Sequence, residues 1–278
     1  MPFVKNKRNR HCWHNLFLKG LIEVKALVTG ASSGIGKAIA TELAKKKINL
    51  ILVARRQAEL DLIKRSLETS YGITVEIRIF DLSTEENCHA LFETCKDDHL
   101  EIVVNNAGFG CVGLFENLEL ETELKMLRLN VISVHILTKL FVKSMEQGVI
   151  LNVASMAGFI PTPNMAAYAA SKAYVYNLSE AINYELKRTK KKVRVLSLCP
   201  GPVNTNFANV AGAKTGFIGM SAEKCAKIAV NGITRGRHII IPGFGMKLTK
   251  FFLRFLPLRL ILPVAFALQR KKDKISAK

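Results

Sequence analysis

Short apolar runs alternate along the chain with longer segments in which apolar residues recur every three or four positions. The short runs, rich in valine, isoleucine and leucine, are typical of strands buried on both faces, and the longer segments are typical of amphipathic helices. We predict about seven strands, at residues 26–28, 50–53, 75–80, 102–105, 149–153, 193–198 and 238–241. Because helical segments separate them, the pattern predicts an α/β fold, with a doubly wound parallel sheet and helices on both faces.

The length of 278 residues suits a single domain with one large core. No internal repeat, low-complexity tract or linker divides the chain. We therefore predict a basic N-terminal arm over residues 1–22, one domain over residues 23–245, and a basic amphipathic extension over residues 246–278.

The net charge of +19 belongs mainly to the two ends of the chain. Residues 1–22 contribute +5 and residues 247–278 contribute +8, which leaves +6 for the long middle segment. These terminal basic residues lack the interleaved aromatic residues of a nucleic-acid surface, so we predict no nucleic-acid partner. The N-terminal arm lacks the apolar core of a secretory signal, although its basic, acid-free composition leaves organelle targeting open.

From Met246 onward, basic and large apolar residues fall on different faces of a helix. The basic set is Lys247, Lys250 and Arg254, and the apolar set is Leu248, Phe251, Phe252 and Phe255. Such a helix suits an anionic membrane surface, and it equally suits packing on the same chain or on a partner subunit. The longest uncharged run, residues 260–269, is too short for a span, which needs about 20 residues. We expect a cytoplasmic protein, with peripheral membrane contact through residues 246–278 as an open alternative.

The cysteines predict a reducing compartment, because they form no CxxC pair and a core of this size needs no disulfides. They are Cys12, Cys88, Cys95, Cys111, Cys199 and Cys225. Residues 11–14 (HCWH) are of metal-ligating types, but they are crowded within the basic arm and lack a partner cluster at zinc-site spacing. We predict no metal site.

A glycine-rich turn follows the first predicted strand. Residues 29–36 read TGASSGIG, and helical sequence continues from Lys37. Glycines without a Cβ let a phosphate approach the backbone amides of a helix N-terminus, where the helix dipole favours anions. The turn therefore predicts a dinucleotide-binding site, with a glycine turn that binds nothing as the alternative.

A second candidate site combines Tyr168, Lys172 and Ser155. Residues i and i+4 of a helix share a face, so the Lys172 ammonium can approach the Tyr168 phenol and favour its ionised form. A free tyrosine titrates near ~10, too high for proton exchange at neutral pH without such help. Ser155 follows a predicted strand, at the edge where open α/β sheets bind ligands. The trio suits the chemistry of a carbonyl group, although YxxxK alone also arises on a partly exposed helix face.

Five segments, in this order and spacing, resemble the short-chain dehydrogenase/reductase family over roughly residues 22–245. They are TGASSGIG, NNAG at 105–108, Ser155, YAASK at 168–172 and PGPVNT at 200–205. The resemblance implies a Rossmann-like fold, an NADP-binding catalytic domain, and a homodimer or homotetramer. The catalytic residues that it implies are Asn130, Ser155, Tyr168 and Lys172. The cofactor-binding residues that it implies are Gly30, Ser32, Ser33, Gly34, Ile35, Gly36, Arg55, Arg56, Asp81, Leu82, Asn105, Ala107, Gly108, Tyr168, Lys172, Pro200, Gly201, Val203 and Thr205.

The end of the second predicted strand bears on the choice of cofactor. Where NAD sites place an acidic residue that holds the ribose 2′-hydroxyl, this chain has Arg55 and Arg56. An arginine fork suits a 2′-phosphate, so we predict NADP(H), with two solvated arginines that open a helix as the alternative. Three other assignments keep alternatives, namely Asp81 as a helix N-cap, Asn105 as a brace of the sheet, and Asn130 as an amide satisfied by local backbone.

The resemblance also implies a mechanism. Tyr168 donates a proton to a carbonyl oxygen while NADPH delivers hydride to the carbon. Lys172 lowers the pKa of the tyrosine and binds the nicotinamide ribose, Ser155 hydrogen-bonds the carbonyl oxygen, and Asn130 supports the resupply of protons.

The substrate is expected to be apolar, because the segments that the family places around it are apolar. These are Phe109, residues 159–161, and a lid at residues 207–220 with Val210, Phe217 and Ile218. A fatty-acyl, steroid-like or lipid aldehyde or ketone, or the matching alcohol, would suit them. The basic ends could equally dock an acidic acyl carrier protein, which would make the chain a 3-oxoacyl reductase. Outside enzymes, the alternative is an NADP sensor or a scaffold at a membrane surface.

Overall fold

The computed structural model describes residues 24–207, 211–212 and 219–273, so the predicted arm at 1–22 lies outside the described residues. The centre of the protein is a seven-stranded sheet in the order β3-β2-β1-β4-β5-β6-β9, with every pair of neighbours parallel. The strands are β1 (Lys25–Thr29), β2 (Asn49–Ala54), β3 (Val75–Ile79), β4 (Ile102–Asn105), β5 (Gln147–Val153), β6 (Lys192–Leu198) and β9 (Ile239–Ile240). The predicted doubly wound sheet is confirmed. Its strand order reverses between β1 and β4, where such sheets bind ligands at the carboxyl edge.

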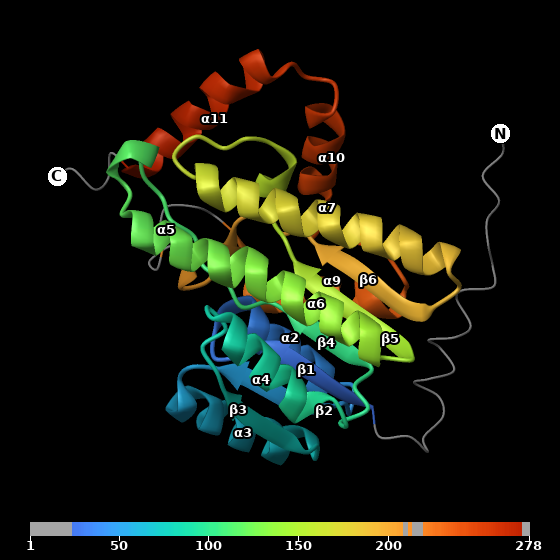
Figure 1. Ribbon diagram of the computed structural model, residues 1–278. Helices are drawn as coiled ribbons and strands as arrows, with labels where there is room; N and C mark the ends of the chain where they lie inside the picture. Colours follow the sequence, from blue (N-terminus) through green and yellow to red (C-terminus); the bar gives the residue numbers. More distant parts are fainter. Residues whose placement is uncertain (1–23, 208–210, 213–218, 274–278) are drawn as a thin grey trace.

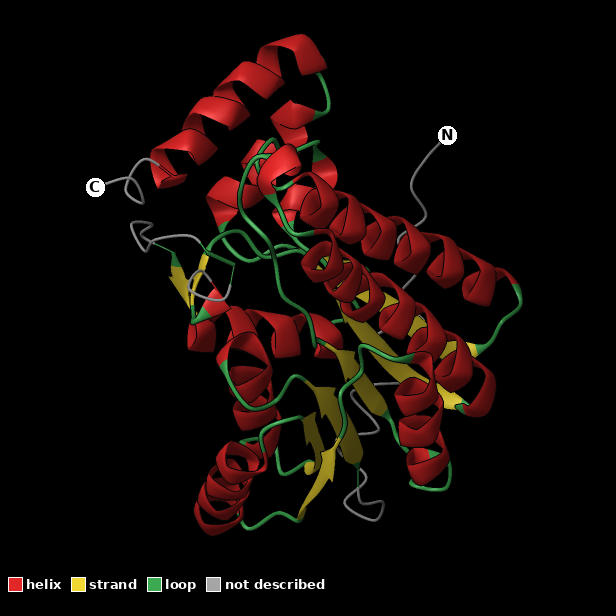
Figure 2. Ribbon diagram, turned by 60° about the vertical axis from the view of Figure 1, so that its left-hand side comes forward, coloured by secondary structure: helices red, strands yellow, loops and turns green. Residues whose placement is uncertain are grey.

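Helices cover both faces of the sheet (Figures 1 and 2). One face carries α2 (Gly34–Ala44), α3 (Gln57–Tyr71) and α9 (Ala222–Thr234), and the other carries α4 (Glu85–Cys95), α6 (Ser133–Ser144) and α7 (Ala166–Arg188). Strand β1 serves both layers, because Ala26 and Val28 pack on the first face and Leu27 on the second. This alternation explains why the strand is apolar at consecutive positions.

Shorter elements surround the carboxyl edge. Helix α5 (Leu120–Leu127) continues into α6 through a π-helical turn, η3 (Arg128–Ile132). Two 3₁₀ turns are η2 (Phe115–Asn117) and η4 (Met156–Phe159), and a small parallel pair joins β7 (Val203–Asn204) to β8 (Met220–Ser221).

Two C-terminal helices, α10 (Phe244–Leu253) and α11 (Leu258–Asp273), lie at the end of the molecule remote from α3 (Figure 1). The helix predicted from Met246 onward thus begins at Phe244, and none of the residues of α10 is buried. Within the described part of the chain, no helix is both long enough and apolar enough to cross a membrane.

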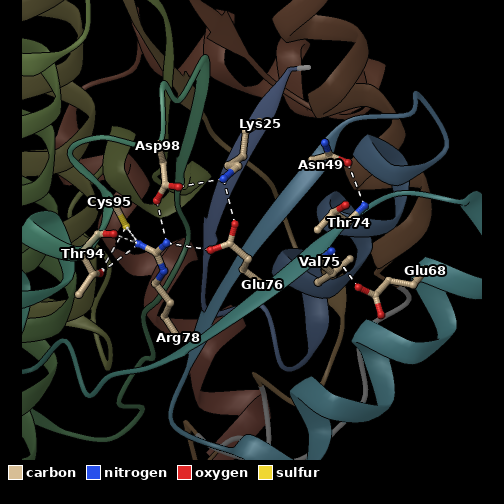
Figure 3. A network of polar contacts seen from close by, with 10 residues as sticks. All are labelled: Lys25, Asn49, Glu68, Thr74, Val75, Glu76, Arg78, Thr94, Cys95 and Asp98. Carbon is tan, nitrogen blue, oxygen red and sulfur yellow. Dashed lines mark hydrogen bonds and ion pairs between the residues drawn. The ribbon is translucent and has the colours of Figure 1, made fainter. Parts of the chain in front are cut away.

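Four charged side chains on the α4 side of the sheet form one network (Figure 3). Lys25, the first residue of β1, contacts Glu76 at 2.9 Å and Asp98 at 2.8 Å through its Nζ. Arg78 contacts the same two carboxylates at 2.9 and 2.7 Å, and it also donates to the backbone and hydroxyl of Thr94. Each charge therefore has two partners of opposite sign, and the network ties β1, β3 and the segment after α4 together.

Candidate active site

Three of the predicted catalytic residues meet at the carboxyl edge of the sheet. Ser155 lies two residues beyond β5, and its hydroxyl accepts a hydrogen bond from the Ala157 amide (3.1 Å), which caps η4. Tyr168 and Lys172 occupy the first two turns of α7, where they are only 8% and 5% exposed. A further hydrogen bond joins Ser155 to the Tyr168 phenol. The structure thus brings together a serine, a tyrosine and a lysine that lie apart in the sequence.

Burial determines the protonation of Tyr168 and Lys172. It raises the pKa of Tyr168 to about 12, against an opposite effect of the hydrogen bond with Ser155. It lowers the pKa of Lys172 to about 8. Lys172 Nζ donates to the Val153 carbonyl (2.9 Å) and lies 5.8 Å from the centroid of the Tyr168 ring. The net pKa of Tyr168 therefore lies above its ordinary value, because desolvation of the phenol outweighs the hydrogen bond with Ser155, and the lowering expected from Lys172 stays a prediction.

Asn130 lies in the π-helical turn η3, a geometry that is frequent at functional sites. Its Oδ1 accepts from the Phe109 amide (3.1 Å), and its Nδ2 donates to the Phe109 carbonyl (2.9 Å) and to the Ser171 hydroxyl (3.2 Å). A Cβ on Gly108 would lie 2.7 Å from Asn130 Oδ1 and 3.5 Å from Lys172 Nζ, so only a glycine fits between them. The amide is satisfied by the backbone of Phe109 and by Ser171, which are distant in the sequence, rather than by local backbone, and its part in proton resupply stays a prediction.

Thr29 and Asn106 shape the glycine turn. Gly30 has a left-handed backbone (φ 64°), and a Cβ on Gly36 would lie 2.3 Å from the Gly30 carbonyl oxygen. Asn106 Nδ2 donates to the carbonyls of Thr29 (3.0 Å) and Gly30 (3.2 Å). The Thr29 hydroxyl accepts from the amides of Asn106 (2.9 Å) and Ala107 (3.0 Å), which joins the ends of β1 and β4. Sequence reasoning did not single out Thr29 or Asn106, although both lie within the quoted motifs.

The N-terminus of α2 fits a phosphate group. Ser33 holds the N-cap position, yet its side chain makes no capping hydrogen bond, so the first amides of the helix lack a side-chain partner. Gly34 is left-handed (φ 56°), and a Cβ there would lie 3.4 Å from the side chain of Thr205. Ile35 packs on the core and holds the turn in place, while the hydroxyl of Ser32 faces Arg56.

Arg55 and Arg56 lie beside this turn, with 61% and 51% of their side chains exposed. Arg56 Nη2 donates to the Ser32 hydroxyl (3.1 Å), and its Nη1 contacts Glu59 at 3.0 Å. Arg55 Nη1 contacts Asp81 at 3.5 Å. Two guanidinium groups between the glycine turn and the end of β3 fit a 2′-phosphate, and the contact with Ser32 places Arg56 at the turn at least as directly as Arg55.

The N-cap alternative for Asp81 is wrong, because Thr84 caps α4 by accepting from the Asn87 amide (3.3 Å). Asp81 accepts instead from the amide (3.1 Å) and hydroxyl (2.8 Å) of Ser83. Burial acts to raise the pKa of Asp81, but these hydrogen bonds, together with the charges of Arg55 and Lys125, outweigh it and hold the pKa below its ordinary value. The side chain of Leu82 is buried beneath α4, which leaves only its backbone to face a cofactor.

Asn105 braces the sheet, as its alternative held. Its Nδ2 donates to Asn152 Oδ1 (2.9 Å) and to the Thr138 hydroxyl (3.2 Å), and Asn152 donates in turn to the Ser179 hydroxyl (2.9 Å). These buried groups link β4 and β5 to α6 and α7. Asn106 is the asparagine whose side chain faces the glycine turn, and the cofactor-binding role expected of Asn105 stays a prediction.

The loop after β6 closes the site from the other side. The Pro200 carbonyl accepts from the amide that follows Ser155 (2.9 Å). Gly201 leaves room for α10, because a Cβ there would lie 2.6 Å from Met246 Sδ. Val203 opens β7 on the way back to the glycine turn. The predicted nicotinamide loop thus spans the distance between Ser155 and the glycine turn.

Apolar side chains surround Tyr168. The Phe207 ring lies against it, with 5.5 Å between ring centroids, in the space that Gly110 leaves by lacking a Cβ. The other large members of this cluster are Phe109, Cys111, Val112, Leu118, Met126, Leu127 and Met165. The proton-bearing group of the site is therefore enclosed by hydrocarbon and aromatic surface.

Part of the predicted substrate lining lies elsewhere. The Phe159 ring packs against Tyr176 beneath α10, with 4.8 Å between centroids, and it belongs to a different apolar cluster from Tyr168. Phe159 therefore lies outside the apolar cluster around Tyr168, and its place in the substrate lining stays a prediction. Val210, Phe217 and Ile218 of the predicted lid lie outside the described residues.

The cysteines of the described region are unpaired and buried, and they are Cys88, Cys95, Cys111, Cys199 and Cys225. In the same region, no group of three or more His, Cys, Asp or Glu side chains could hold a metal ion. The segment 11–14 with Cys12 lies outside it.

Comparisons with known proteins agree on one family. A family model described as short chain dehydrogenase matches residues 24–216. Hydroxysteroid dehydrogenase-like protein 1 of Gallus gallus is 34% identical over 227 residues, which cover 79% of this chain and 67% of that protein. Very-long-chain 3-oxoacyl-CoA reductase of Anas platyrhynchos is 31% identical over 216 residues, covering 75% and 68%. The solved short-chain dehydrogenase of Sphingobium yanoikuyae in complex with NADPH is 30% identical with a TM-score of 0.75, covering 80% of this chain and 88% of that one.

Proposed function

This chain belongs to the short-chain dehydrogenase/reductase family, and we propose that it uses NADP(H) to reduce a carbonyl group of an apolar substrate or to oxidise the matching alcohol. One observation carries the proposal. The buried phenol of Tyr168 hydrogen-bonds with Ser155 and lies beside Lys172 at the carboxyl edge of the sheet. A proton donor in that position suits carbonyl reduction, because the substrate oxygen gains negative charge as hydride reaches the carbon.

In the proposed reduction, Tyr168 releases its proton to the carbonyl oxygen while Ser155 hydrogen-bonds that oxygen. NADPH, when bound, supplies the hydride. At neutral pH the phenol holds its proton, since burial raises its pKa to about 12. Lys172 keeps its charge below its pKa of about 8 and stabilises the tyrosinate that remains after the transfer. The reverse oxidation uses the same groups, with the tyrosinate as the proton acceptor.

Asn130 is proposed to act behind Lys172. The two side chains approach each other across Gly108, and Asn130 fixes the backbone of Phe109 beside them. A rigid amide at this point suits a role in returning a proton to Lys172 and then to Tyr168, the role that the family resemblance implies.

The cofactor is proposed to be NADP(H) rather than NAD(H). The end of β2 carries Arg55 and Arg56 where an NAD site needs an acidic residue, and Arg56 already contacts Ser32 of the glycine turn. The cradle for the pyrophosphate would be the uncapped start of α2, where Gly30 and Gly36 leave no room for side chains. The complex of a related short-chain dehydrogenase with NADPH supports the same choice.

The substrate is proposed to be an apolar aldehyde, ketone or alcohol. The apolar cluster around Tyr168 supports this, because a polar substrate would lose its hydration there without gaining partners. Two relatives with names that refer to hydroxysteroids and to very-long-chain 3-oxoacyl groups point in the same direction.

A second candidate is the reduction of a 3-oxoacyl group that is carried on a thioester. The relationship to a very-long-chain 3-oxoacyl-CoA reductase favours it, and the basic C-terminal segment would attract an anionic carrier, whether coenzyme A or an acyl carrier protein. The non-enzyme alternatives have no such support, since Asn130, Ser155, Tyr168 and Lys172 are all present.

We propose that the protein forms a homodimer or homotetramer, as family members commonly do. Its proposed location is the cytoplasm, with contact to a membrane surface through the segment 246–278. An apolar substrate concentrates in lipid, which makes that surface a suitable place for this reaction.

The test is a panel of carbonyl compounds, followed by the absorbance of NADPH and, in parallel, of NADH. The panel runs from small ketones to steroid-like ketones, long-chain aldehydes and 3-oxoacyl-CoA thioesters. We expect turnover with the apolar members and with NADPH. Turnover confined to small polar ketones, or none with any member, would contradict the proposal.

Two arginine variants test the choice of cofactor. Arg55→Ala and Arg56→Ala should each raise the KM for NADPH at least tenfold and leave the KM for NADH nearly unchanged, because only NADPH carries the 2′-phosphate. Arg65→Ala, an exposed position on α3, is the matched control and should change neither. Equal losses for both cofactors would remove the phosphate role from these arginines.

A further inference from the structure

The exposed apolar side chains of the protein are concentrated on the two C-terminal helices. Of the 19 large apolar side chains that are exposed in the described residues, 11 lie between residues 244 and 268. Phe244 and Phe255 are 81% and 67% exposed. A patch of this kind marks an interaction surface rather than an ordinary protein exterior. We propose that this surface, the α10–α11 face, docks the protein on an anionic lipid membrane.

The orientation of α10 leaves its apolar side uncovered. Lys250 is turned toward the body, where its Nζ lies 4.4 Å from the centroid of the Phe159 ring and 5.1 Å from that of Tyr176. Met246, one turn earlier on the same side, packs on Gly201. A cation therefore anchors the inner side of the helix while aromatic rings face outward, the reverse of an ordinary surface helix. Packing of the apolar face on the same chain, an alternative left open by the sequence, is wrong for the described residues.

The charges around the face match anionic lipid. Lys247, Arg254 and Arg259 are exposed beside the apolar side chains, and residues 244–269 contain no aspartate or glutamate. Each such cation near a membrane surface attracts anionic headgroups. A second copy of the chain is a poorer occupant, because a symmetric contact through this face would bring like charges together without any acid to pair them.

The helices suit docking in the plane of the membrane. Neither is long and apolar enough to cross it. Pro257 separates α10 from α11, and Pro263 lies inside α11, so the pair follows a surface rather than forming one straight rod. Amphipathic helices of this kind bury their apolar side at the boundary between headgroups and acyl chains.

Docking through this face would hold the candidate active site beside the lipid. Helix α10 packs on η4, which directly follows Ser155, and on Gly201 of the loop after β6. An apolar substrate could then pass from the bilayer to Tyr168 without crossing water. This last step rests on the proposed function, whereas the docking itself does not.

The experiment is flotation of the full chain with vesicles, which requires no turnover. Wild-type protein should float with phosphatidylcholine vesicles that contain 30% phosphatidylserine, and several-fold less with pure phosphatidylcholine. Phe251→Ser/Phe255→Ser should reduce flotation at least tenfold, and Lys247→Glu/Arg254→Glu should abolish the preference for phosphatidylserine.

Matched controls separate docking from unspecific adhesion. Leu62→Ser/Leu120→Ser removes two apolar side chains that are 68% and 66% exposed on other helices, and it should float like wild type. All variants should melt at the wild-type temperature, because the altered side chains are exposed. Equal flotation of Phe251→Ser/Phe255→Ser and wild type would overturn the proposal. The proposal would also be overturned if wild type did not float and Phe251→Ser/Phe255→Ser changed the protein from a dimer to a monomer. The α10–α11 face would then be an interface between two copies.

The kinetic consequence is tested separately, with a substrate found by the carbonyl panel. Turnover of that substrate dissolved in phosphatidylserine-containing vesicles should fall at least fivefold in Phe251→Ser/Phe255→Ser, while turnover of a water-soluble substrate stays at the wild-type rate. If flotation succeeds and no carbonyl is reduced, the docking surface stands and the proposed function fails. If the carbonyl is reduced and flotation fails, the proposed function stands and the docking surface fails.

Discussion

Two clusters of ionisable side chains on the same sheet respond to burial in opposite ways. In the network on the α4 side, burial acts to lower the pKa of Lys25 and Arg78 and to raise that of Asp98, but the opposite charges outweigh it. Each of these groups therefore keeps its charge more firmly than it would in water. At the carboxyl edge, burial prevails: it raises the pKa of Tyr168 to about 12 and lowers that of Lys172 to about 8.

The difference lies in the partners. The Lys25 ammonium has two carboxylates within 3 Å, whereas the Lys172 ammonium has a backbone carbonyl and a neutral phenol. The first arrangement stabilises the fold and leaves no group ready to change its proton. The second costs stability: it brings the pKa of Lys172 close to neutral pH and keeps the proton on the Tyr168 phenol. The contrast separates charges that stabilise the fold, in the α4-side network, from the ionisable groups proposed to take part in the reaction, at the carboxyl edge.

The largest expected effect is on turnover. Tyr168→Phe removes the proton donor and keeps the ring, so reduction of the best substrate should fall by about 10²–10⁴-fold. The free energy of unfolding should stay within about 1 kcal/mol of wild type, because the packing against Phe207 remains. NADPH oxidation measures the first and urea unfolding the second. Retained turnover would show that another group supplies the proton.

A substitution in the α4-side network should lower stability and leave turnover unchanged. Arg78→Ala leaves Glu76 and Asp98 with one partner each, so the free energy of unfolding should fall by about 1–3 kcal/mol while kcat and KM stay unchanged. Urea unfolding and NADPH oxidation measure the two quantities. Arg65→Ala is again the control. A loss of turnover without a loss of stability would break the contrast between the clusters.

A smaller effect depends on pH. Lys25 and Arg78 hold the pKa of Asp98 below its ordinary value, so its stabilising effect is present above the unfolded pKa of about 4 and is lost as the pH falls through the folded pKa. Asp98→Asn should therefore cost about 1 kcal/mol at pH 7 and progressively less below pH 4. Unfolding curves of both proteins between pH 2.5 and pH 7 test this. A cost that is independent of pH would assign the effect to packing.

The smallest effect is expected from an exposed ion pair. Lys96 contacts Glu93 at 2.8 Å at the end of α4, where both side chains are about half exposed and solvent screens the interaction. Glu93→Gln should leave the unfolding midpoint unchanged within the error of the measurement. A loss as large as that of Arg78→Ala would mean that distance alone, and not the shared partners, determines the stability of the network.

The sheet was predictable from the sequence because its strands are buried on both faces, which makes them continuous apolar runs. The positions of Ser155, Tyr168 and Lys172 followed from motif order and from the meeting of parallel strands at one edge. The local sequence pattern did not predict which way each polar side chain points at the edge of the sheet. Asn105 and Asn106 are adjacent in NNAG, yet alternation along the strand sends one into the sheet–helix interface and the other to the glycine turn.

Tertiary burial was equally invisible in the sequence. The spacing of Tyr168 and Lys172 suggests a lysine that lowers the tyrosine pKa, but the pKa depends on how much water the fold removes around both groups. The face of α10 is a similar case. The sequence separates basic from apolar positions, and only the packing of Lys250 on Phe159 reveals which of them turns inward.

The most direct test of the contrast is the unfolding free energy of Lys172→Met beside wild type from pH 7 to pH 10. At pH 7, a lysine with a pKa of about 8 instead of 10.5 costs the fold about 3 kcal/mol, partly offset by its bond to the Val153 carbonyl. We predict that inactive Lys172→Met is more stable than wild type at pH 7. This advantage should shrink as the pH rises through 8 toward 10, because the folded lysine is then neutral while the unfolded one is still charged. If Lys172→Met is less stable than wild type at pH 7 and the difference does not change with pH, the claim that the buried charge of Lys172 lowers the free energy of unfolding is contradicted.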